Sequence, residues 1–257
     1  MLRLALALIL LALPGLAQEA PTRLETLETG SDSRGWEAVG RLELGASFCT
    51  GTLIGPDLVL TAAHCLFDSL SGKMIPTDQI QFRAGWRNGR AVAYRGARRA
   101  VEHPSYQYQG ADKIDRVAWD LALIELDQPI RLPQLRPFGL DGPPAPGEHV
   151  EVVSYAHDRA EAPSLQKSCT VLERPADVVL MDCSVDFGSS GAPVFAIRAG
   201  APQIVSVISA KAEYNKSPVS LGTLVGRVAD LKAALNARAA PQAAQFSRQG
   251  GAKFVRP

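Results

Sequence analysis

The sequence predicts an all-β protein in which two antiparallel β-barrels are followed by a C-terminal α-helix. Short segments rich in Val, Ile and Leu recur along the chain and are bounded by Gly, Pro, Asp or Asn, as strands are. The 257 residues include 22 glycines and 18 prolines without a regular period, which suits many turns. A clear helical spacing of apolar residues occurs only near the C-terminus. Many strands followed by one helix favour barrels over an alternating α/β sheet.

The N-terminal residues have the features of an export signal. Arg3 supplies a positive charge, residues 4–13 are an unbroken apolar run, and Gly15-Leu16-Ala17 offers small residues to a signal peptidase. The run is shorter than the roughly 18–20 apolar residues that span a bilayer. We therefore expect a signal peptide at residues 1–17, with cleavage after Ala20 as the alternative. The protein is then secreted, to the periplasm or the extracellular medium, without a membrane anchor.

The remainder of the chain divides into three parts. Residues 18–34 are polar and acidic, and we expect a propeptide or loose leader there. The domain that carries the two barrels is predicted at residues 35–240. Residues 241–257 contain Gln, Gly and Arg without periodicity, so they are predicted to be a loose tail.

The individual elements follow from the spacing of apolar residues. Between residues 228 and 240, Val228, Leu231 and Leu235 fall on one face, so a helix that packs on the second barrel is expected. Each predicted strand is a short apolar run that ends at turn-forming residues. The predicted strands comprise residues 41–50, 58–62, 80–85, 91–101, 121–126, 150–155, 167–172, 178–181, 193–197, 204–209 and 221–225.

Charge and cysteine content narrow the function classes. The formal net charge is +1, from 27 basic and 26 acidic side chains, so nothing indicates a nucleic-acid partner. Four cysteines in an exported protein favour disulfides, for which three pairings are possible. The alternative, a metal site, lacks support because neither a Cys-x-x-Cys nor a His-x-x-x-His spacing occurs. We therefore expect no metal and no cofactor.

Three short segments indicate chemistry when they are taken together. His64 follows Thr61-Ala62-Ala63, Asp120 precedes Leu121-Ala122-Leu123, and Ser190 lies within Gly188-Ser189-Ser190-Gly191-Ala192-Pro193. A serine hydroxyl needs a base, histidine suits that role, and a buried carboxylate fixes the histidine tautomer. Glycines beside the serine let backbone N–H groups face a developing oxyanion. We predict His64, Asp120 and Ser190 as catalytic residues, with an oxyanion hole at the N–H groups of Gly188 and Ser190.

Neighbouring residues of the same types compete with these assignments. Asp115 lacks an apolar strand directly after it, and Asp127 falls in an Asp-Gln-Pro turn. Ser189 lies beside Ser190, but a glycine two residues before and one after fits Ser190 better. His103 precedes Pro104, and we expect it to pack or hydrogen-bond at a turn.

The three segments resemble the chymotrypsin/trypsin family of serine peptidases. Residues 48–54, the His64 and Asp120 segments and residues 188–193 all look like segments of that family, and the resemblance covers about residues 35–240. The Gly-x-Ser-Gly-x-Pro form is similar to the bacterial glutamyl-endopeptidase-like branch. The resemblance implies a double six-stranded β-barrel with the active site between the barrels. It also implies the disulfides Cys49–Cys65 and Cys169–Cys183.

The chain departs from the digestive branch of the family at three points. Ser189 stands where that branch has an aspartate, which pairs with a newly freed N-terminus, and Ala192 replaces a glycine. No Ile-Val-Gly-Gly segment occurs near Arg34. We therefore expect activity to depend little on one defined new N-terminus, although cleavage near Arg34 is compatible with the sequence.

The resemblance also implies a primary specificity pocket. Ser184, six residues before the nucleophile, corresponds to its base, and residues 208–211 correspond to its wall, including Ser209, Ala210 and Lys211. A neutral base does not favour Arg or Lys in the substrate. Lys211 stands where a glycine is usual, and it either narrows the entrance, offers a cation to an acidic side chain, or points to solvent. We predict a preference for small, apolar or acidic residues before the scissile bond.

The leading hypothesis is a secreted serine endopeptidase that hydrolyses peptide bonds through an acyl-enzyme. It would act as a monomer on protein or peptide substrates, with no nucleic-acid partner and no cofactor. The alternative is an exported, catalytically inactive binding module on a protease scaffold, which the altered activation residues leave open. An esterase of the α/β-hydrolase type does not fit, because that fold orders its triad Ser, acid, His.

Overall fold

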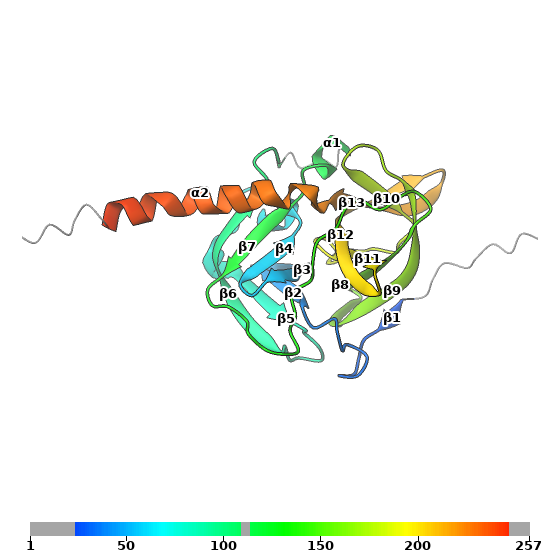
Figure 1. The fold of residues 1–257 in the computed structure, drawn as a ribbon, viewed down its shortest axis with the longest axis horizontal. Coiled ribbons are helices and arrows are strands. Elements are labelled where there is room, and N and C mark those ends of the chain that lie inside the picture. Colours follow the sequence, from blue (N-terminus) through cyan, green and yellow to red (C-terminus); the bar gives the residue numbers. More distant parts are fainter. Residues whose placement is uncertain (1–23, 109–113, 247–257) are drawn as a thin grey trace, which may run out of the picture.

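Two β-barrels lie side by side in a computed structural model of the protein, and a long helix runs across one of them (Figure 1). The structure describes residues 24–108 and 114–246. The predicted signal peptide, its cleavage sites after Ala17 and Ala20, and residues 247–257 of the predicted tail lie outside the described residues. The predicted fold class, two six-stranded antiparallel barrels with a C-terminal helix, is confirmed.

The first barrel closes in the strand order β2-β3-β4-β7-β6-β5. Apolar side chains alternate inward along its strands, and Leu42, Leu60 and Phe82 are fully buried in its interior. The single strand predicted at residues 41–50 is wrong, because the chain turns back at Gly45, whose φ of 62° suits glycine. Its strands are β2 (Val39–Leu44), β3 (Ser47–Gly55), β4 (Leu58–Thr61), β5 (Ile80–Ala84), β6 (Ala93–Glu102) and β7 (Ala122–Leu126).

The second barrel closes because β8 pairs with both β9 and β11. Two of its strands are much longer than predicted, since polar residues beyond the apolar runs continue the pairing as protruding hairpins. The β12–β13 ladder, for example, extends to the pair Tyr214–Ser217. The strands are β8 (His149–Ala156), β9 (Arg159–Glu173), β10 (Val178–Met181), β11 (Pro193–Arg198), β12 (Ala201–Tyr214) and β13 (Ser217–Leu224).

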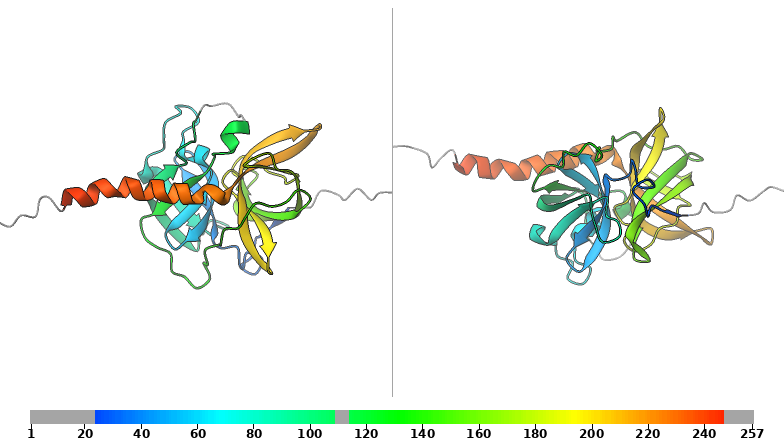
Figure 2. Two further views of the ribbon diagram at one scale, coloured as in Figure 1. Left: turned by 45° about the horizontal axis from the view of Figure 1, so that its top comes forward. Right: turned by 90° about the horizontal axis from the view of Figure 1, so that it is seen from below.

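The part of the expected leader that the structure describes is packed against the second barrel. A short strand, β1 (Glu25–Thr26), pairs with β9, and the Leu27 N–H donates to the Pro163 carbonyl at 2.9 Å. Leu27 itself is only 4% exposed. From residue 24 onward this segment is therefore not loose. It then passes between the barrels to enter β2, which the dark blue trace in Figure 2 follows.

The C-terminal helix α2 (Val228–Phe246) begins where it is predicted to begin and extends beyond residue 240. It packs on the first barrel, against β6 and β7, so the expected placement on the second barrel is wrong. Leu231 and Leu235 join the core of the first barrel, and Arg99 donates to the Leu235 carbonyl at 2.8 Å. The apolar stripe predicts that a face is buried but not which surface covers it.

Short helical turns complete the described chain. They are α1 (Ile114–Val117) and the 3-10 turns η1 (Ala63–Leu66), η2 (Thr77–Gln79) and η3 (Val225–Arg227). His103 is buried before Pro104, where it accepts from the Ser105 N–H at 3.1 Å and packs on Trp119. Within residues 24–108 and 114–246, no helix is long and apolar enough to cross a membrane.

The barrels share an apolar interface that also carries polar links. Tyr155 on β8 is fully buried, and its hydroxyl donates to the Trp86 carbonyl at 2.8 Å. Its N–H donates to the Thr50 hydroxyl on β3 at 3.1 Å, and that hydroxyl donates to the Gly188 carbonyl at 2.9 Å. Because these groups are buried, the links fix the segment around Gly188 relative to the first barrel.

Candidate active site

His64 lies on η1, directly after β4, at the junction of the two barrels. Ala62 and Ala63 before it are fully buried, which seats the turn in the first barrel. The disulfide Cys49–Cys65 joins the turn to β3. The His64 side chain remains 26% exposed, so the turn holds the ring at the surface of the junction.

Asp120 is brought to His64 because β7, which follows it, pairs with β4. The carboxylate is 2% exposed and accepts from the His64 N–H at 2.8 Å, and it lies 2.7 Å from His64 Nδ1. The Ser209 hydroxyl on β12 also donates to it. Burial acts to raise the pKa of Asp120, but the His64 charge and these hydrogen bonds outweigh it and hold the pKa below its usual value. The pair therefore presents a charged carboxylate to the imidazole.

Ser190 lies in the turn between β10 and β11, and two glycines determine its position. Gly188 has φ 98°, and a Cβ there would lie 2.4 Å from the Phe48 ring. Gly191 has φ 79°, and a Cβ there would lie 2.1 Å from the Thr61 hydroxyl, near the end of β4. The Ser190 carbonyl accepts from the Thr50 N–H at 2.8 Å. The turn is thus packed directly on the strands that lead to His64.

The two neighbouring serines occupy different environments. Ser189 is fully buried, and its hydroxyl lies 3.2 Å from the Tyr155 carbonyl. Ser190 is partly exposed at the surface of the turn. In the described part of the chain, the N–H groups of Gly188 and Ser190 donate to no backbone acceptor, whereas the N–H of Ser189 donates to the Asp186 carbonyl. The turn therefore offers two unused donors beside the Ser190 hydroxyl, as oxyanion stabilisation requires.

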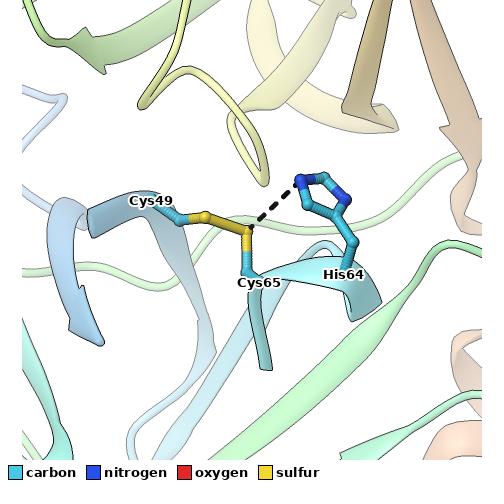
Figure 3. A group of neighbouring side chains, drawn as sticks. All are labelled: Cys49, His64 and Cys65. Carbon is cyan, nitrogen blue, oxygen red and sulfur yellow. Dashed lines mark hydrogen bonds between the residues drawn. A yellow bond between two sulfur atoms is a disulfide. The ribbon is translucent and has the colours of Figure 1, made fainter. Parts of the chain in front are cut away.

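The sulfur atoms near His64 are joined to each other. Figure 3 shows His64 beside the Cys49–Cys65 bridge, with 3.9 Å between the Cys65 sulfur and His64 Nε2. These three residues are the one group of potential metal ligands found among residues 24–108 and 114–246. Cysteine binds a metal as a thiolate, and the disulfide leaves neither Cys49 nor Cys65 in that form. The second bridge, Cys169–Cys183, joins β9 to the segment after β10.

We expect removal of the Cys49–Cys65 bridge to weaken both stability and activity. The bridge closes a loop of 16 residues, so the double variant with Ala at both positions should lose about 2–4 kcal/mol of unfolding free energy. Turnover should also fall, because the bridge seats the His64 turn. Denaturant unfolding and peptidase assays measure the two effects. The Cys169–Cys183 double variant is the control, with a stability loss but a smaller activity loss, and a Cys49–Cys183 crosslink in non-reducing peptide maps would refute the pairing.

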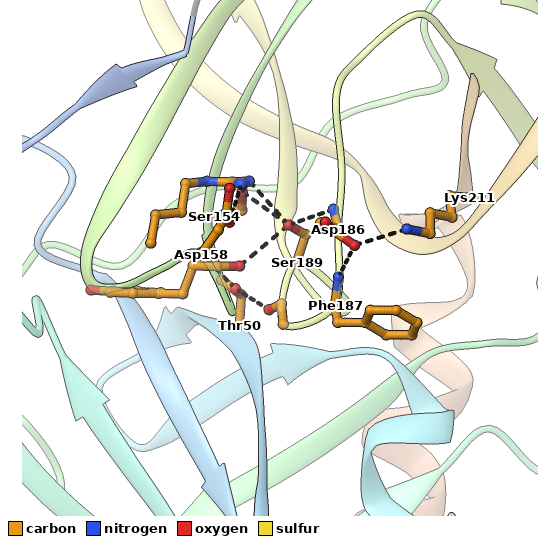
Figure 4. A network of polar contacts seen from close by, with 10 residues as sticks. Thr50, Ser154, Asp158, Asp186, Phe187, Ser189 and Lys211 are labelled. Atoms are coloured by element: carbon orange, nitrogen blue, oxygen red, sulfur yellow. Dashed lines mark hydrogen bonds and ion pairs between the residues drawn. The ribbon is translucent and has the colours of Figure 1, made fainter. Parts of the chain in front are cut away.

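The residues predicted to form the specificity pocket make contacts that the sequence did not predict. Ser184 is exposed, and its N–H donates to the Gln166 side chain at 2.7 Å. Ser209 directs its hydroxyl to Asp120 rather than to a pocket, and Ala210 is partly buried against a small apolar cluster. Lys211 Nζ lies 2.8 Å from the Asp186 carboxylate and 4.8 Å from the centre of the Phe187 ring (Figure 4). Lys211 therefore contacts the segment that precedes Ser190.

Two contributors to this region carried no recognisable signal in the sequence. The contact of Ser209 with Asp120 joins residues 89 positions apart, and no local pattern marks a serine on a strand as a partner of a carboxylate. Arg159, at the start of β9, reaches the Ser189 hydroxyl at 3.3 Å. The first contact depends on how the two barrels are placed, and the second depends on how the strands of the second barrel are placed.

The chain is similar to peptidases of known sequence. The trypsin-like peptidase domain family matches residues 49–202. Glutamyl endopeptidase of Bacillus licheniformis is 26% identical over 172 residues, which cover 66% of this chain and 52% of that protein. Serine protease 23 of Rattus norvegicus is 26% identical over 213 residues, which cover 72% of this chain and 54% of that protein. The chain thus spans about half the length of the curated relatives it matches.

The fold has a similar counterpart among solved structures. A structure of Glu endopeptidase in complex with MPD superposes with a TM-score of 0.67 at 18% identity. The superposition covers 84% of this chain and 97% of that one. At this sequence identity, the similarity shows that the two proteins share the arrangement of the two barrels.

Proposed function

Because the chain belongs to the trypsin-like peptidase family, we propose that it is a secreted serine endopeptidase with His64, Asp120 and Ser190 as its triad. The observation that carries the proposal is the buried carboxylate of Asp120, which contacts His64 twice beside the glycine-flanked Ser190 turn. A structural histidine or a surface serine does not need this combination. The expected substrate is a protein or peptide, and the two disulfides fit an exported protein.

In the proposed reaction the Ser190 hydroxyl oxygen attacks the scissile carbonyl while His64 Nε2 takes its proton. The Nδ1–H of the resulting imidazolium donates to Asp120, whose negative charge stabilises it. The N–H groups of Gly188 and Ser190 stabilise the tetrahedral oxyanion. His64 then gives its proton to the leaving amine, which leaves an ester on Ser190. A water molecule, deprotonated by His64, hydrolyses that ester and restores the free hydroxyl.

A fluorophosphonate probe tests the proposal directly. An activated serine should be labelled in the wild-type protein, whereas the Ser190→Ala variant should not be labelled. The exposed Ser217 provides a matched control, since Ser217→Ala should label like the wild type. Absence of labelling and of peptide cleavage by the folded wild-type protein would instead favour the inactive binding module.

The pocket residues support a preference against basic substrates. Asp182 accepts from the Thr170 N–H, and Asp186 is paired with Lys211, so both carboxylates that flank Ser184 are engaged elsewhere. The Lys211 hydrogen bond is the main cause that lowers the pKa of Asp186. One curated relative is named for glutamyl cleavage, which accords with an acidic residue before the scissile bond. We propose that the enzyme cuts after small, apolar or acidic residues.

Cleavage-site profiling on a peptide library measures this preference. Small, apolar or acidic residues should dominate before the scissile bond, and Lys211→Gln should lower cleavage after acidic residues roughly twofold to fivefold relative to apolar ones. This size suits a partly exposed charge contact, since the Lys211 side chain is 54% exposed. Lys232→Gln, an exposed lysine on α2, is the control. Dominant cutting after Arg or Lys would contradict the pocket assignment and leave the triad unaffected.

A further inference from the structure

The loop that carries Ser190 rests on the tip of the β8–β9 hairpin. The His157 N–H donates to the Phe187 carbonyl at 2.8 Å, and the Ser189 hydroxyl lies 3.2 Å from the Tyr155 carbonyl. A Cβ on Gly188 would lie 3.0 Å from the Ala156 Cα, so the two backbones touch there. Each of residues 187–189 therefore contacts the hairpin, so the turn that carries Ser190 packs directly on it.

The hairpin places one cation beneath that turn. Arg159 follows the hairpin turn, and its guanidinium donates to the Ser189 and Ser154 hydroxyls at 3.3 and 3.2 Å. Its side chain is only 11% exposed, and its carboxylate partner is the exposed Asp158 at 3.1 Å. Ser189 in turn accepts from the Asp186 N–H at 3.3 Å, so the contact reaches both ends of the 186–189 segment (Figure 4).

Burying this cation is costly unless its charge is paired and its donors are hydrogen-bonded. A guanidinium removed from water needs compensation, and two hydroxyls and one exposed carboxylate supply only part of it. Burial is the main cause that lowers the pKa of Arg159, and Asp158 opposes that shift. In the digestive branch of the family, from which the sequence departs here, the position of Ser189 holds an aspartate paired with the cation of a new N-terminus. Here the Ser189 hydroxyl is neutral, and the cation beside it is the side chain of Arg159 rather than a new N-terminus.

We propose that Arg159 is a positioning residue that holds the Gly188–Ser190 turn with its two free N–H groups directed at the substrate carbonyl. This rests on the proposed peptidase function and deepens it. Because the cation belongs to the chain itself, the turn is organised without a cut N-terminus. Arg159 touches neither substrate nor Ser190 and acts through Ser189.

Substitution of Arg159 separates this role from a merely structural one. Arg159→Met keeps approximately the length of the side chain but removes its charge and its hydrogen-bond donors. We expect kcat to fall about 100-fold and KM to change less than about twofold, because the loss would come from a misplaced catalytic group. Arg159→Lys restores the charge and should recover part of kcat. Arg174→Met, which alters an exposed arginine, should behave like the wild type. Ser189→Ala, a smaller change, should lower kcat in the same direction.

Hydrogen exchange of the unliganded protein provides a readout that is independent of activity. In Arg159→Met, peptides covering residues 184–192 should exchange faster, while those covering β6 should not change. A normal kcat and unchanged exchange in Arg159→Met would overturn the proposal, as would a Lys variant no better than Met or a loss confined to KM. A wild-type protein that cleaves nothing would refute the proposed function, and the exchange difference would then still decide whether Arg159 orders the turn.

Discussion

Replacing Ser190 with Ala is expected to lower kcat by roughly 10⁶-fold, and replacing His64 with Ala should cost a similar factor. Either change removes the nucleophile or its base, and the reaction then loses its covalent route. The double variant should be hardly worse than either single variant, because the two residues act as one unit. Steady-state hydrolysis of a peptide amide, with unfolding midpoints measured in parallel, tests the prediction.

Two matched substitutions show whether the loss belongs to the site. His149 and Ser217 are exposed and distant from the catalytic turn in the chain, so His149→Ala and Ser217→Ala should keep wild-type turnover. Any activity measured in Ser190→Ala should be assigned to the variant only if it persists after further purification. Near wild-type hydrolysis by either Ser190→Ala or His64→Ala would show that the triad is wrongly assigned.

Replacing Asp120 with Asn should lower kcat by about 10⁴-fold with a small effect on KM. The amide keeps the shape of the side chain but loses the charge, so it neither holds the required His64 tautomer nor stabilises the imidazolium. Asp115→Asn, which changes an exposed neighbour in the chain, is the control and should be close to the wild type. A loss smaller than tenfold in Asp120→Asn would indicate that another carboxylate serves His64.

The same variant has a signature in acid unfolding. Folding lowers the pKa of Asp120, so its charged form contributes stability above its unfolded pKa of about 4, and that contribution disappears as the pH falls through the folded value. An Asn side chain does not titrate, so the stability of Asp120→Asn should fall less steeply with acid. Denaturant unfolding at a series of acidic pH values measures the slope, and an unchanged slope would contradict the assigned titration.

The fold class and the candidate triad were accessible from the sequence because local patterns mark them. A short apolar run followed by a small-residue turn marks His64, and a glycine on either side marks Ser190. The hairpin at residues 39–55 was missed because one glycine, Gly45, reverses an otherwise continuous apolar pattern. The surface covered by α2 was assigned to the wrong barrel, since amphipathicity defines a face and not its partner.

Contacts between distant strands account for the rest of the site. Ser209 reaches Asp120 only when the two barrels pack on each other, and Arg159 reaches Ser189 only when the strands of the second barrel are in place. Ser209 and Lys211 were predicted in the wall of the specificity pocket, but nothing in the sequence pointed to their contacts with Asp120 and with Asp186, which is 25 residues from Lys211 in the chain.

The pairing of β1 with β9 means that the described polypeptide crosses between the barrels three times, before β2, before β8 and again after β13, where α2 packs back on the first barrel. One crossing acts as a single pivot, about which two bodies can twist, whereas several separate crossings oppose such rotation. The N-terminal segment therefore helps to fix the two barrels relative to each other, independently of the side chains at their interface. A cut at the exposed Arg34 would remove one of these covalent crossings and leave the segment before it held to the second barrel by its hydrogen bonds and by the buried Leu27.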